Sequence, residues 1–502
     1  MTAVSRPRSP GPGRSRSILD KLRAALITPV RAMRLRYLPL LMIYYAYGAL
    51  GLITIAQAFW IKQALTLTPA ELAGIAVWLT LPWTIKMVFG QLVDSVPVLG
   101  SQRRAYVFMG ASLVATGLIV LAGAAGGWIA FASPNALYVM AQLLIVIGIV
   151  LQDVVADAMT TEVVDRTRPD GTPRPLLEIE RDLGLVQVLG RLALWSGILS
   201  VAGLSGWLAQ AFSYETVFLL GLVIPVVSVT GALLVRLDGT RPRPIDWRIL
   251  GGGLLFGAVV VAIGLGGVRY GQELVFFISL TVIGLMLFRV AEEVDESHRK
   301  RILFAALVIF LYRASPGVGE GYRWFTIDVL GFDESFYGTL AQIGAALSLA
   351  GAWIFSDVIT RQPIAKVLLW LTIIGTILSL PTLALALRWD EWTEQMFGFG
   401  ARTIAFIDTT ASSPFAELSM IPALTLVALN APAGRRATWF ALMASLMNVA
   451  LVAGQLQTKY LNWMFAVDRG SYEHLAALVA AALLIGFVVP VAGILAFGKR
   501  AT

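Results

Sequence analysis

Long apolar stretches separated by short polar segments run along almost the whole of this 502-residue chain. A helix that crosses a bilayer needs about 20 consecutive apolar residues, and fourteen stretches approach or exceed that length. They lie near residues 38–65, 70–93, 105–130, 136–163, 183–210, 214–236, 249–268, 272–290, 302–330, 334–358, 364–388, 403–430, 435–463 and 474–498. The pattern predicts an all-α polytopic membrane protein with fourteen spans, preceded by a basic tail over residues 1–37.

Composition supports this interpretation and narrows the chemistry. Only 14% of the residues are charged, against about 25% in a soluble domain, and the mean hydropathy is +0.76. There is no cysteine, and the two histidines, His298 and His474, stand in polar segments. We therefore expect no metal site and no cofactor. Since no nucleophile elbow or phosphate-binding loop occurs either, the sequence does not predict an enzyme.

The basic residues fall on one side of the predicted membrane. The formal charge of +8 would suggest nucleic acid in a soluble protein, but in a polytopic protein cytoplasmic loops carry the excess of Lys and Arg. With the N-terminus inside, the inner segments hold Arg103, Arg104, Arg166, Arg168, Arg174, Arg181, Arg241, Arg243, Arg248, Arg299, Lys300, Arg301, Arg361, Lys366, Arg435, Arg436, Lys499 and Arg500. The outer segments hold only Arg269, Arg388, Arg402 and Arg469. This bias predicts a bacterial inner (plasma) membrane protein with both termini in the cytoplasm and no nucleic-acid partner.

The two halves of the chain repeat a pattern of polar positions. Asp153, Asp157 and Glu162 recur at the same spacing as Asp408, Ser412 and Glu417, and Arg191 with Gly197 recurs as Asn448 with Gly454. Internal repeats of this kind are typical of secondary transporters, whose solute sites lie between the repeats near the bilayer midplane. The match predicts six-helix bundles at 38–236 and 302–498, with an inserted helix pair within 237–301.

Charged residues within the predicted spans are costly in lipid, so they face a partner or a cavity. Lys86 has no acid within one helical turn, and we expect it to line the cavity. Arg191 is expected to approach Asp157, as an interhelical ion pair or as part of a solute site. Other charges in the spans are Arg313, Glu320, Arg323 and Asp328, along a helix with an expected break at Pro316 and Gly317, and Asp408 and Glu417.

Asp153 and Asp157 are four residues apart and share a helix face. Because no histidine lies in the core of a span, carboxylates are the natural proton carriers, and we assign coupling to Asp153, Asp157 and Asp408. The structural alternative is that Arg191 neutralises one of the first two acids and that the other is solvated.

A short inner loop follows the second span, from Asp94 to Arg103 and Arg104. Charges at helix ends can clamp neighbouring helices there, and Asp357 ends the corresponding helix of the second half. We assign gating to Asp94, Arg103, Arg104, Glu162 and Asp357.

Several segments resemble the folate–biopterin transporter family of the major facilitator superfamily. The segments that carry the resemblance are 81–86 (LPWTIK), 90–106 (GQLVDSVPVLGSQRRAY), 152–158 (QDVVADA) with Glu162 and Arg166, 313–316 (RASP) through 330–332 (LGF), 420–422 (MIP), 432–434 and 437–443 (ATWFALM) with Asn448. The resemblance implies a major facilitator fold and proton-coupled import of folates or pterins by a monomer. Trp83, Lys86, Arg191, Tyr312, Arg313, Arg323 and Asn448 are then the candidate solute contacts. The aromatic members also fit the ordinary enrichment of Trp and Tyr at membrane interfaces.

Two features depart from that family. The inserted helix pair gives fourteen spans instead of twelve, as in muropeptide permeases, and Ser412 breaks the acidic pattern of the second half. A muropeptide or another organic anion is therefore an alternative solute. A non-transporting assembly or pigment-delivery protein is the alternative of another class, although a passive scaffold has no need of clustered buried charges.

Overall fold

The computed structural model describes residues 33–98, 100–168, 170–234, 244–292, 294–360, 362–431 and 436–501, and within them it is built of helices joined by short loops. Isolated bridges such as Val98 with Ser101 are the only β pairing in these ranges. The predicted tail up to residue 32 lies outside the described residues, as do Arg241, Arg243, Arg361 and Arg435. The all-α prediction is confirmed.

The first bundle comprises the helices from residue 35 to residue 234. Proline or a side-chain cap starts several of them; Thr68 and Glu71, for example, form a capping box at the start of α4. The helices are η1 (Leu35–Tyr37), α2 (Leu38–Ala49), η2 (Leu50–Ile53), α3 (Thr54–Ala64), α4 (Pro69–Thr84), α5 (Lys86–Ser95), α6 (Arg104–Gly126), α7 (Pro134–Glu162), α8 (Leu176–Ala211), α9 (Tyr214–Leu220) and α10 (Val223–Leu234).

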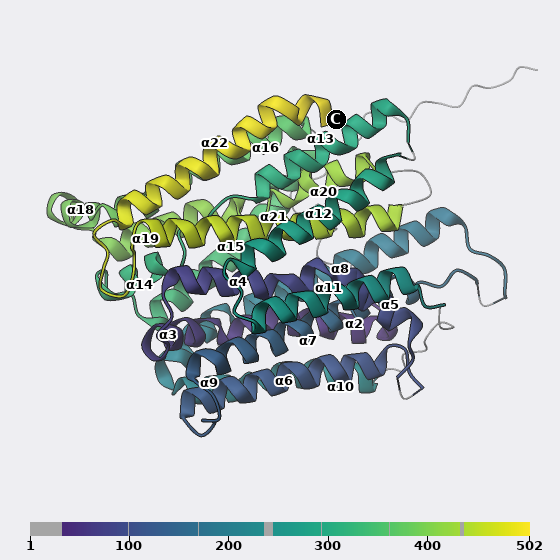
Figure 1. Cartoon of the computed structure of the whole chain (residues 1–502), viewed down its shortest axis with the longest axis horizontal. Coiled ribbons are helices and arrows are strands. Elements are labelled where there is room, and N and C mark those ends of the chain that lie inside the picture. The colour runs from purple at the N-terminus through teal and green to yellow at the C-terminus, as the bar shows by residue number, and fades with distance from the viewer. Residues whose placement is uncertain are drawn as a thin grey trace, which may run out of the picture.

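A hairpin of two helices follows, α11 (Trp247–Leu265) and α12 (Gly271–Glu292), and then the second bundle. The second bundle consists of α13 (Glu296–Arg313), α14 (Glu320–Asp328), α15 (Glu334–Thr360), α16 (Ile364–Leu378), α17 (Leu380–Ala386), α18 (Trp389–Phe397), α19 (Ala401–Ser412), η3 (Ser413–Phe415), α20 (Met420–Leu429), α21 (Arg436–Met464) and α22 (Leu475–Ala501). Figure 1 shows the helices running along the long axis, with the start of α2 and the end of α22 at the same end. We call this end the terminal side and the opposite end, where α18 lies, the far side.

Thirteen helices of the described chain are long and apolar enough to cross a membrane. The fourteenth predicted span, 302–330, is divided between α13 and α14, which are separated at residues 314–319. The predicted break at Pro316 and Gly317 therefore exists. Side chains of α21 satisfy the backbone groups that the break frees: Gln457 donates to the Ala314 carbonyl, and Gly317 N donates to Thr458. A transmembrane helix tolerates a break where neighbouring helices supply such partners.

The helices approach most closely where glycines face each other. A Cβ on Gly48 of α2 would lie 2.1 Å from the Leu194 carbonyl oxygen of α8, so a side chain there would force the helices apart. Between the bundles, a Cβ on Gly206 of α8 would lie 2.5 Å from the Cα of Gly338 on α15. Small residues at such crossings allow tight backbone packing in lipid, and they hold the two bundles together in the far-side half.

The hairpin lies against both bundles. On the first bundle, Val88 of α5 fills the space beside Gly253 of α11. On the second bundle, the Nζ of Lys459 on α21 lies 2.6 Å from the Oε1 of Glu273 on α12. The hairpin is thus packed along one side of the boundary between the bundles, while most of α11 stays exposed to lipid.

Candidate functional site

A large cavity opens on the terminal side between the two bundles. Its volume is about 1180 Å³. The first bundle contributes residues from α4, α5, α7, α8 and the loop after α7, and the second bundle contributes apolar residues of α20 and α21, including Phe440 and Met443. The charged residues lining it are Lys86, Asp94, Arg103, Asp157, Glu162, Asp165, Arg166 and Arg191. The polar chemistry therefore comes mainly from the first bundle.

The break between α4 and α5 places Lys86 in this cavity. Pro82 removes one backbone donor, the helix is interrupted at Ile85, and Lys86 begins the next helix. Two side chains of α21 bind the carbonyls beside the break: Asn448 Nδ2 donates to Trp83 O at 3.1 Å, and Ser445 Oγ donates to Thr84 O at 3.0 Å. The second bundle thus supports the segment that carries the lysine.

Lys86 is held between two carboxylates of α7. Its Nζ lies 2.5 Å from the Oδ2 of Asp153 and 2.6 Å from the Oδ2 of Asp157. The two acids differ in their surroundings, because 11% of the Asp153 side chain is exposed and 51% of the Asp157 side chain is exposed. The Tyr44 hydroxyl donates to the other oxygen of Asp157 at 2.7 Å. The cluster carries one positive and two negative charges when all three groups are ionised.

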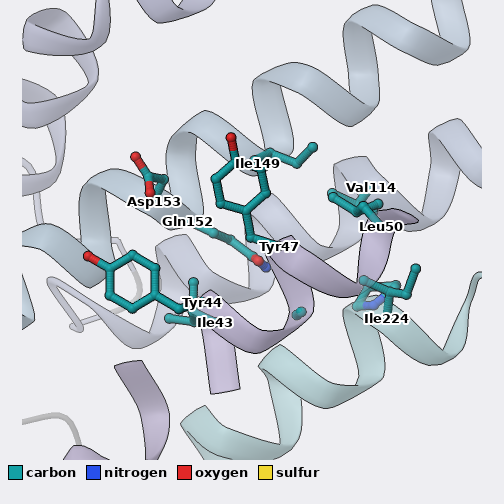
Figure 2. A pocket seen from close by; sticks show the side chains of 11 residues that line it. Ile43, Tyr44, Tyr47, Leu50, Val114, Ile149, Gln152, Asp153 and Ile224 are labelled. Carbon is teal, nitrogen blue, oxygen red and sulfur yellow. The ribbon is translucent and has the colours of Figure 1, made fainter. Parts of the chain in front are cut away.

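A narrow pocket lies behind Asp153, inside the first bundle. Figure 2 shows Tyr44, Tyr47, Gln152 and Asp153 at this pocket together with apolar residues such as Ile149. Its volume is about 10 Å³, close to the smallest space that holds one water molecule. The Gln152 amide is already bound to the Val107 carbonyl and to Ser228. Asp153 therefore lines this small pocket and binds Lys86, which lines the large cavity.

Arg191 does not form the ion pair with Asp157 that we predicted from the sequence. The guanidinium lines the cavity and is exposed there, and it forms no ion pair within the described residues. Lys86 takes the predicted place of Arg191 beside Asp157. Within the described residues, Arg191 is therefore a cation of the cavity wall that no ion pair neutralises.

The predicted gating residues separate into two groups. Arg103 is buried and bridges two acids: its Nη2 lies 2.9 Å from Asp94 Oδ1 and 2.6 Å from Glu162 Oε1. This ties the loop after α5 to the end of α7, and charge-assisted bonds of this kind are strong. Arg104 instead lies over the Phe108 ring on another face of α6. The side chain of Asp357 lies outside the described part of the structure.

The remaining predicted contacts lie in the second bundle, away from the lining of the cavity. Arg313 has its Nη1 3.1 Å from the sulfur of Met420, and Arg323 pairs with Glu320 on the same helix at 3.1 Å. Tyr312 lines a separate space of about 450 Å³ between α13, α16, α17 and α22. Asp408 lies beside Thr382 of α17. The structure therefore does not gather Tyr312, Arg313, Arg323 and Asp408 with Lys86.

Two aromatic residues of α2 also belong to the site and were not predicted from the sequence. Tyr44 binds Asp157, and the Tyr47 ring stacks on Trp83 with ring centroids 5.8 Å apart. A tyrosine within an apolar span needs a partner for its hydroxyl, so the Tyr44-Tyr45 pair was a signal in the sequence. At the mouth of the cavity, the hydrogen bond from Arg36 lowers the pKa of Asp165.

The fold is similar to that of solved peptide transporters. A crystal structure of a peptide transporter POT in complex with sulfate has a TM-score of 0.60 at 17% identity, over 95% of each chain. A POT family transporter in complex with thioalcohol conjugated peptide has a TM-score of 0.62 at 15% identity, over 93% of this chain and 96% of that one. At such low identity the likeness concerns the fold alone.

The particular family follows from the sequence. The BT1 family profile matches residues 48–500, and the chain belongs to this family. It is similar to a folate-biopterin transporter of Synechocystis sp. (strain ATCC 27184 / PCC 6803 / Kazusa), with 26% identity over 452 residues, 88% of this chain and 78% of the relative. It is also similar to a probable folate-biopterin transporter 4 of Arabidopsis thaliana, with 22% identity over 497 residues, 92% and 95% of the two chains. The predicted family is confirmed, and the protein is a multi-pass transporter and not an enzyme.

Proposed function

We propose that the protein imports folate- or pterin-like anions together with protons across a bacterial inner (plasma) membrane. The observation that carries the proposal is the pairing of Lys86 with both Asp153 and Asp157 in the same cavity as Arg191, which forms no ion pair within the described residues. The names of the relatives supply the solute class. In this orientation the terminal side faces the cytoplasm, in agreement with the basic residues of its loops.

The cluster around Lys86 serves as the proton site. Repulsion between two nearby carboxylates in a partly dehydrated cavity favours the binding of one proton. One proton makes the cluster neutral, and its release restores a net negative charge that Lys86 alone cannot balance. Because Lys86 belongs to the broken segment held by α21, a change in its bonds to α7 is felt at the contact between the bundles.

Arg191 and Trp83 serve as the solute contacts in the first bundle. A guanidinium binds a carboxylate through two parallel hydrogen bonds, and within the described residues Arg191 forms no ion pair that it would first have to release. The Trp83 ring lines the cavity beside Tyr47 and offers a flat surface for a pterin ring. Stacking of a planar heterocycle on an aromatic side chain is worth about 1–3 kcal/mol.

Uptake by purified protein in vesicles tests the coupling. An imposed pH gradient, acidic outside, is expected to drive accumulation of labelled folate, and a protonophore is expected to stop it. Asp153→Asn and Asp157→Asn should abolish accumulation and keep exchange of folate across the membrane. Asp333→Asn is the matched control, because Asp333 pairs with Arg402 on the far side of the second bundle. If both variants still concentrate folate in response to the gradient, the two aspartates are structural.

Thermal-shift screening tests the solute class separately. A ligand that binds the native state raises its thermal stability, so folates and pterins are expected to stabilise the protein, and Arg191→Gln should remove the effect of folate. Stabilisation by muropeptides, with none by folates or pterins, would replace the solute and leave the carrier mechanism standing.

A further inference from the structure

The bundles also meet on the far side, opposite the cavity, through a group of polar and aromatic residues. Three segments come together there: the end of α3 in the first bundle, α14 in the second, and the loop between α21 and α22. The bonds that join the end of α3 to the other two segments link residues about 260 to 410 positions apart. We call this contact the far-side seal and define it by Lys62, Trp324, Asp328, Arg469 and Tyr472.

Arg469 completes the end of a helix that belongs to the other bundle. Its guanidinium donates to three backbone carbonyls, Ile61 O at 3.2 Å, Lys62 O at 3.0 Å and Leu67 O at 2.7 Å. The last carbonyls of a helix lack partners within that helix, and a cation at this end also interacts favourably with the helix dipole. Ile61 O also accepts from Leu65 N, and Leu67 lies beyond the helix, so the second bundle supplies part of the C-terminal cap of α3, at Lys62 O, and also holds the loop that follows.

Trp324 fills the space beneath this cap. It is fully buried although it belongs to α14 of the second bundle, and it packs within an apolar cluster made otherwise mostly of first-bundle residues, among them Trp60 and Leu65. The Arg469 guanidinium lies 4.0 Å from the Trp324 ring centroid, well within the range of a cation–π contact. The indole nitrogen of Trp324 has no hydrogen-bond partner in the described structure.

A second polar contact lies beside the first. The Nζ of Lys62 on α3 is 2.5 Å from Asp328 Oδ1 on α14, and the Tyr472 hydroxyl is 2.5 Å from the other oxygen of Asp328. Asp328 thus joins the end of α3 to the same loop that carries Arg469. Deeper in the boundary, Phe59 of α3 packs edge-on against Tyr337 of α15 and is buried.

We propose that Arg469 and Trp324 are the residues that hold the far side of the transporter closed, with Arg469 acting as a helix cap that the second bundle withdraws when the far side opens. The proposal rests on the transport function proposed above, since only a carrier must open both sides in turn. When the far side opens, the carbonyls that Arg469 binds and the indole N–H of Trp324 become exposed to water. Water can then form hydrogen bonds with each of these groups. The bonds of Arg469 oppose this exchange, and the unpaired indole donor favours it.

The absence of cysteine in the chain allows single reporter cysteines. Phe59→Cys reports on the buried boundary below the seal, and Ala158→Cys reports on the terminal-side cavity that Ala158 lines. Each is placed in the full-length protein in vesicles and labelled with a membrane-impermeant maleimide from one side. Labelling needs no transported solute, so its outcome is independent of whether folate is carried.

Arg469→Ala is expected to raise far-side labelling at position 59 by about tenfold and to lower terminal-side labelling at position 158, because the population shifts to the outward-open state. Arg469→Lys keeps the charge without the fork of donors and should give an intermediate shift. The matched control is Arg402→Ala, which removes a far-side ion pair to Asp333 within the second bundle and should change neither rate.

Opposite changes at the two positions support the seal, because a general loosening of the fold would raise both rates. Trp324→Phe keeps the apolar plug and removes the unpaired donor, and it should lower labelling at position 59 relative to the parent. Unchanged labelling in Arg469→Ala, or a parallel rise at both positions, would overturn the proposal. If the labelling results confirm the seal but the protein does not take up folate, the proposed seal stands and only the proposed solute is refuted.

Discussion

The two bundles hold their charges in different ways. In the first bundle, ion pairs join separate elements: Lys86 of α5 binds Asp153 and Asp157 of α7, and Arg103 joins the loop after α5 to Glu162. In the described part of the second bundle, Arg323 pairs with Glu320 on its own helix, and the pair between separate elements, Arg402 with Asp333, lies at helix ends on the far side and not in the cavity. Arg313 lies against a methionine sulfur.

Because of this difference, the two bundles are expected to have different roles in transport, although the sequence repeat alone would suggest equal roles. A proton that neutralises Asp153 or Asp157 changes a contact between two helices, whereas a proton on a carboxylate paired within one helix leaves the helix positions unaltered. Under the proposed coupling, the first bundle is therefore the half that converts protonation into movement. The second bundle supplies the partners against which it moves, such as Ser445 and Asn448 at the α4–α5 break.

The largest expected effect is that of Lys86→Met. It leaves two carboxylates without their shared cation, and removing one partner of a buried pair typically costs about 3–5 kcal/mol. We expect the lower end of this range, because the cluster borders a cavity. Thermal unfolding of the purified protein measures the loss, and the double variant Lys86→Met/Asp153→Asn should recover part of it. A midpoint equal to that of the parent would show that the pairs are not stabilising.

Arg191→Gln should act on the solute and leave the fold unchanged. Arg191 forms no ion pair within the described residues, so its loss removes no stabilising contact of that kind. We expect the KM for folate uptake to rise about tenfold, which corresponds to about 1.4 kcal/mol of binding, at unchanged thermal stability. Arg191→Lys should recover only part of the affinity because lysine lacks the planar fork. A lowered unfolding midpoint with an unchanged KM would make Arg191 a structural residue.

Arg313→Met provides the direct contrast with Lys86→Met. Arg313 is half-buried and forms no ion pair within the described residues; only the more distant charge of Glu417 offsets its lost hydration. An apolar side chain of similar length should therefore leave the stability unchanged or raise it by up to about 1 kcal/mol. Differential scanning fluorimetry of both variants under one condition measures the difference. Equal destabilisation of the two would mean that the bundles use their charges alike.

The smallest expected effect concerns Asp165, outside the membrane. Its pKa lies below the ordinary value because of the hydrogen bond from Arg36, so the ionised form stabilises the fold above the unfolded pKa of about 3.9. This contribution is lost as the pH falls through the lower, folded pKa. Half of the Asp165 side chain is exposed, so Asp165→Asn should cost only about 0.5 kcal/mol at pH 7. The difference from the parent should shrink in unfolding scans at acidic pH, and a difference that grows there would contradict the assignment.

Apolar length and the placement of proline and glycine were sufficient to predict most of the fold. Both depend on local sequence, so the spans, the break at Pro316 and Gly317, and the hairpin within 237–301 follow from reading along the chain. The cavity position of Lys86 was also predictable, since a lone lysine in a span needs an aqueous or ionic environment.

The partners within the site were less accessible to sequence reasoning. Which cation meets Asp157 depends on the rotation of α5 and α8 about their own axes, and that rotation is set by contacts such as Gly48 with Leu194 and Val88 with Gly253. The predicted approach of Arg191 to Asp157 brings both residues to the same cavity, but the ion pair with Asp157 is formed by Lys86. In the sequence, Arg469 was notable only as one of the few basic residues in an outer segment. Its three partners are backbone carbonyls, which every residue has, so no sequence pattern could predict these bonds.

The hairpin α11–α12 has a consequence for the biosynthesis of the protein. Successive helices enter a membrane in alternating directions, so one extra helix between the bundles would insert the second bundle upside down. Two extra helices cancel each other, and both bundles keep the orientation that they would have without the insertion. A helix pair can therefore be added or removed at this junction without inverting either bundle, whereas a single helix cannot.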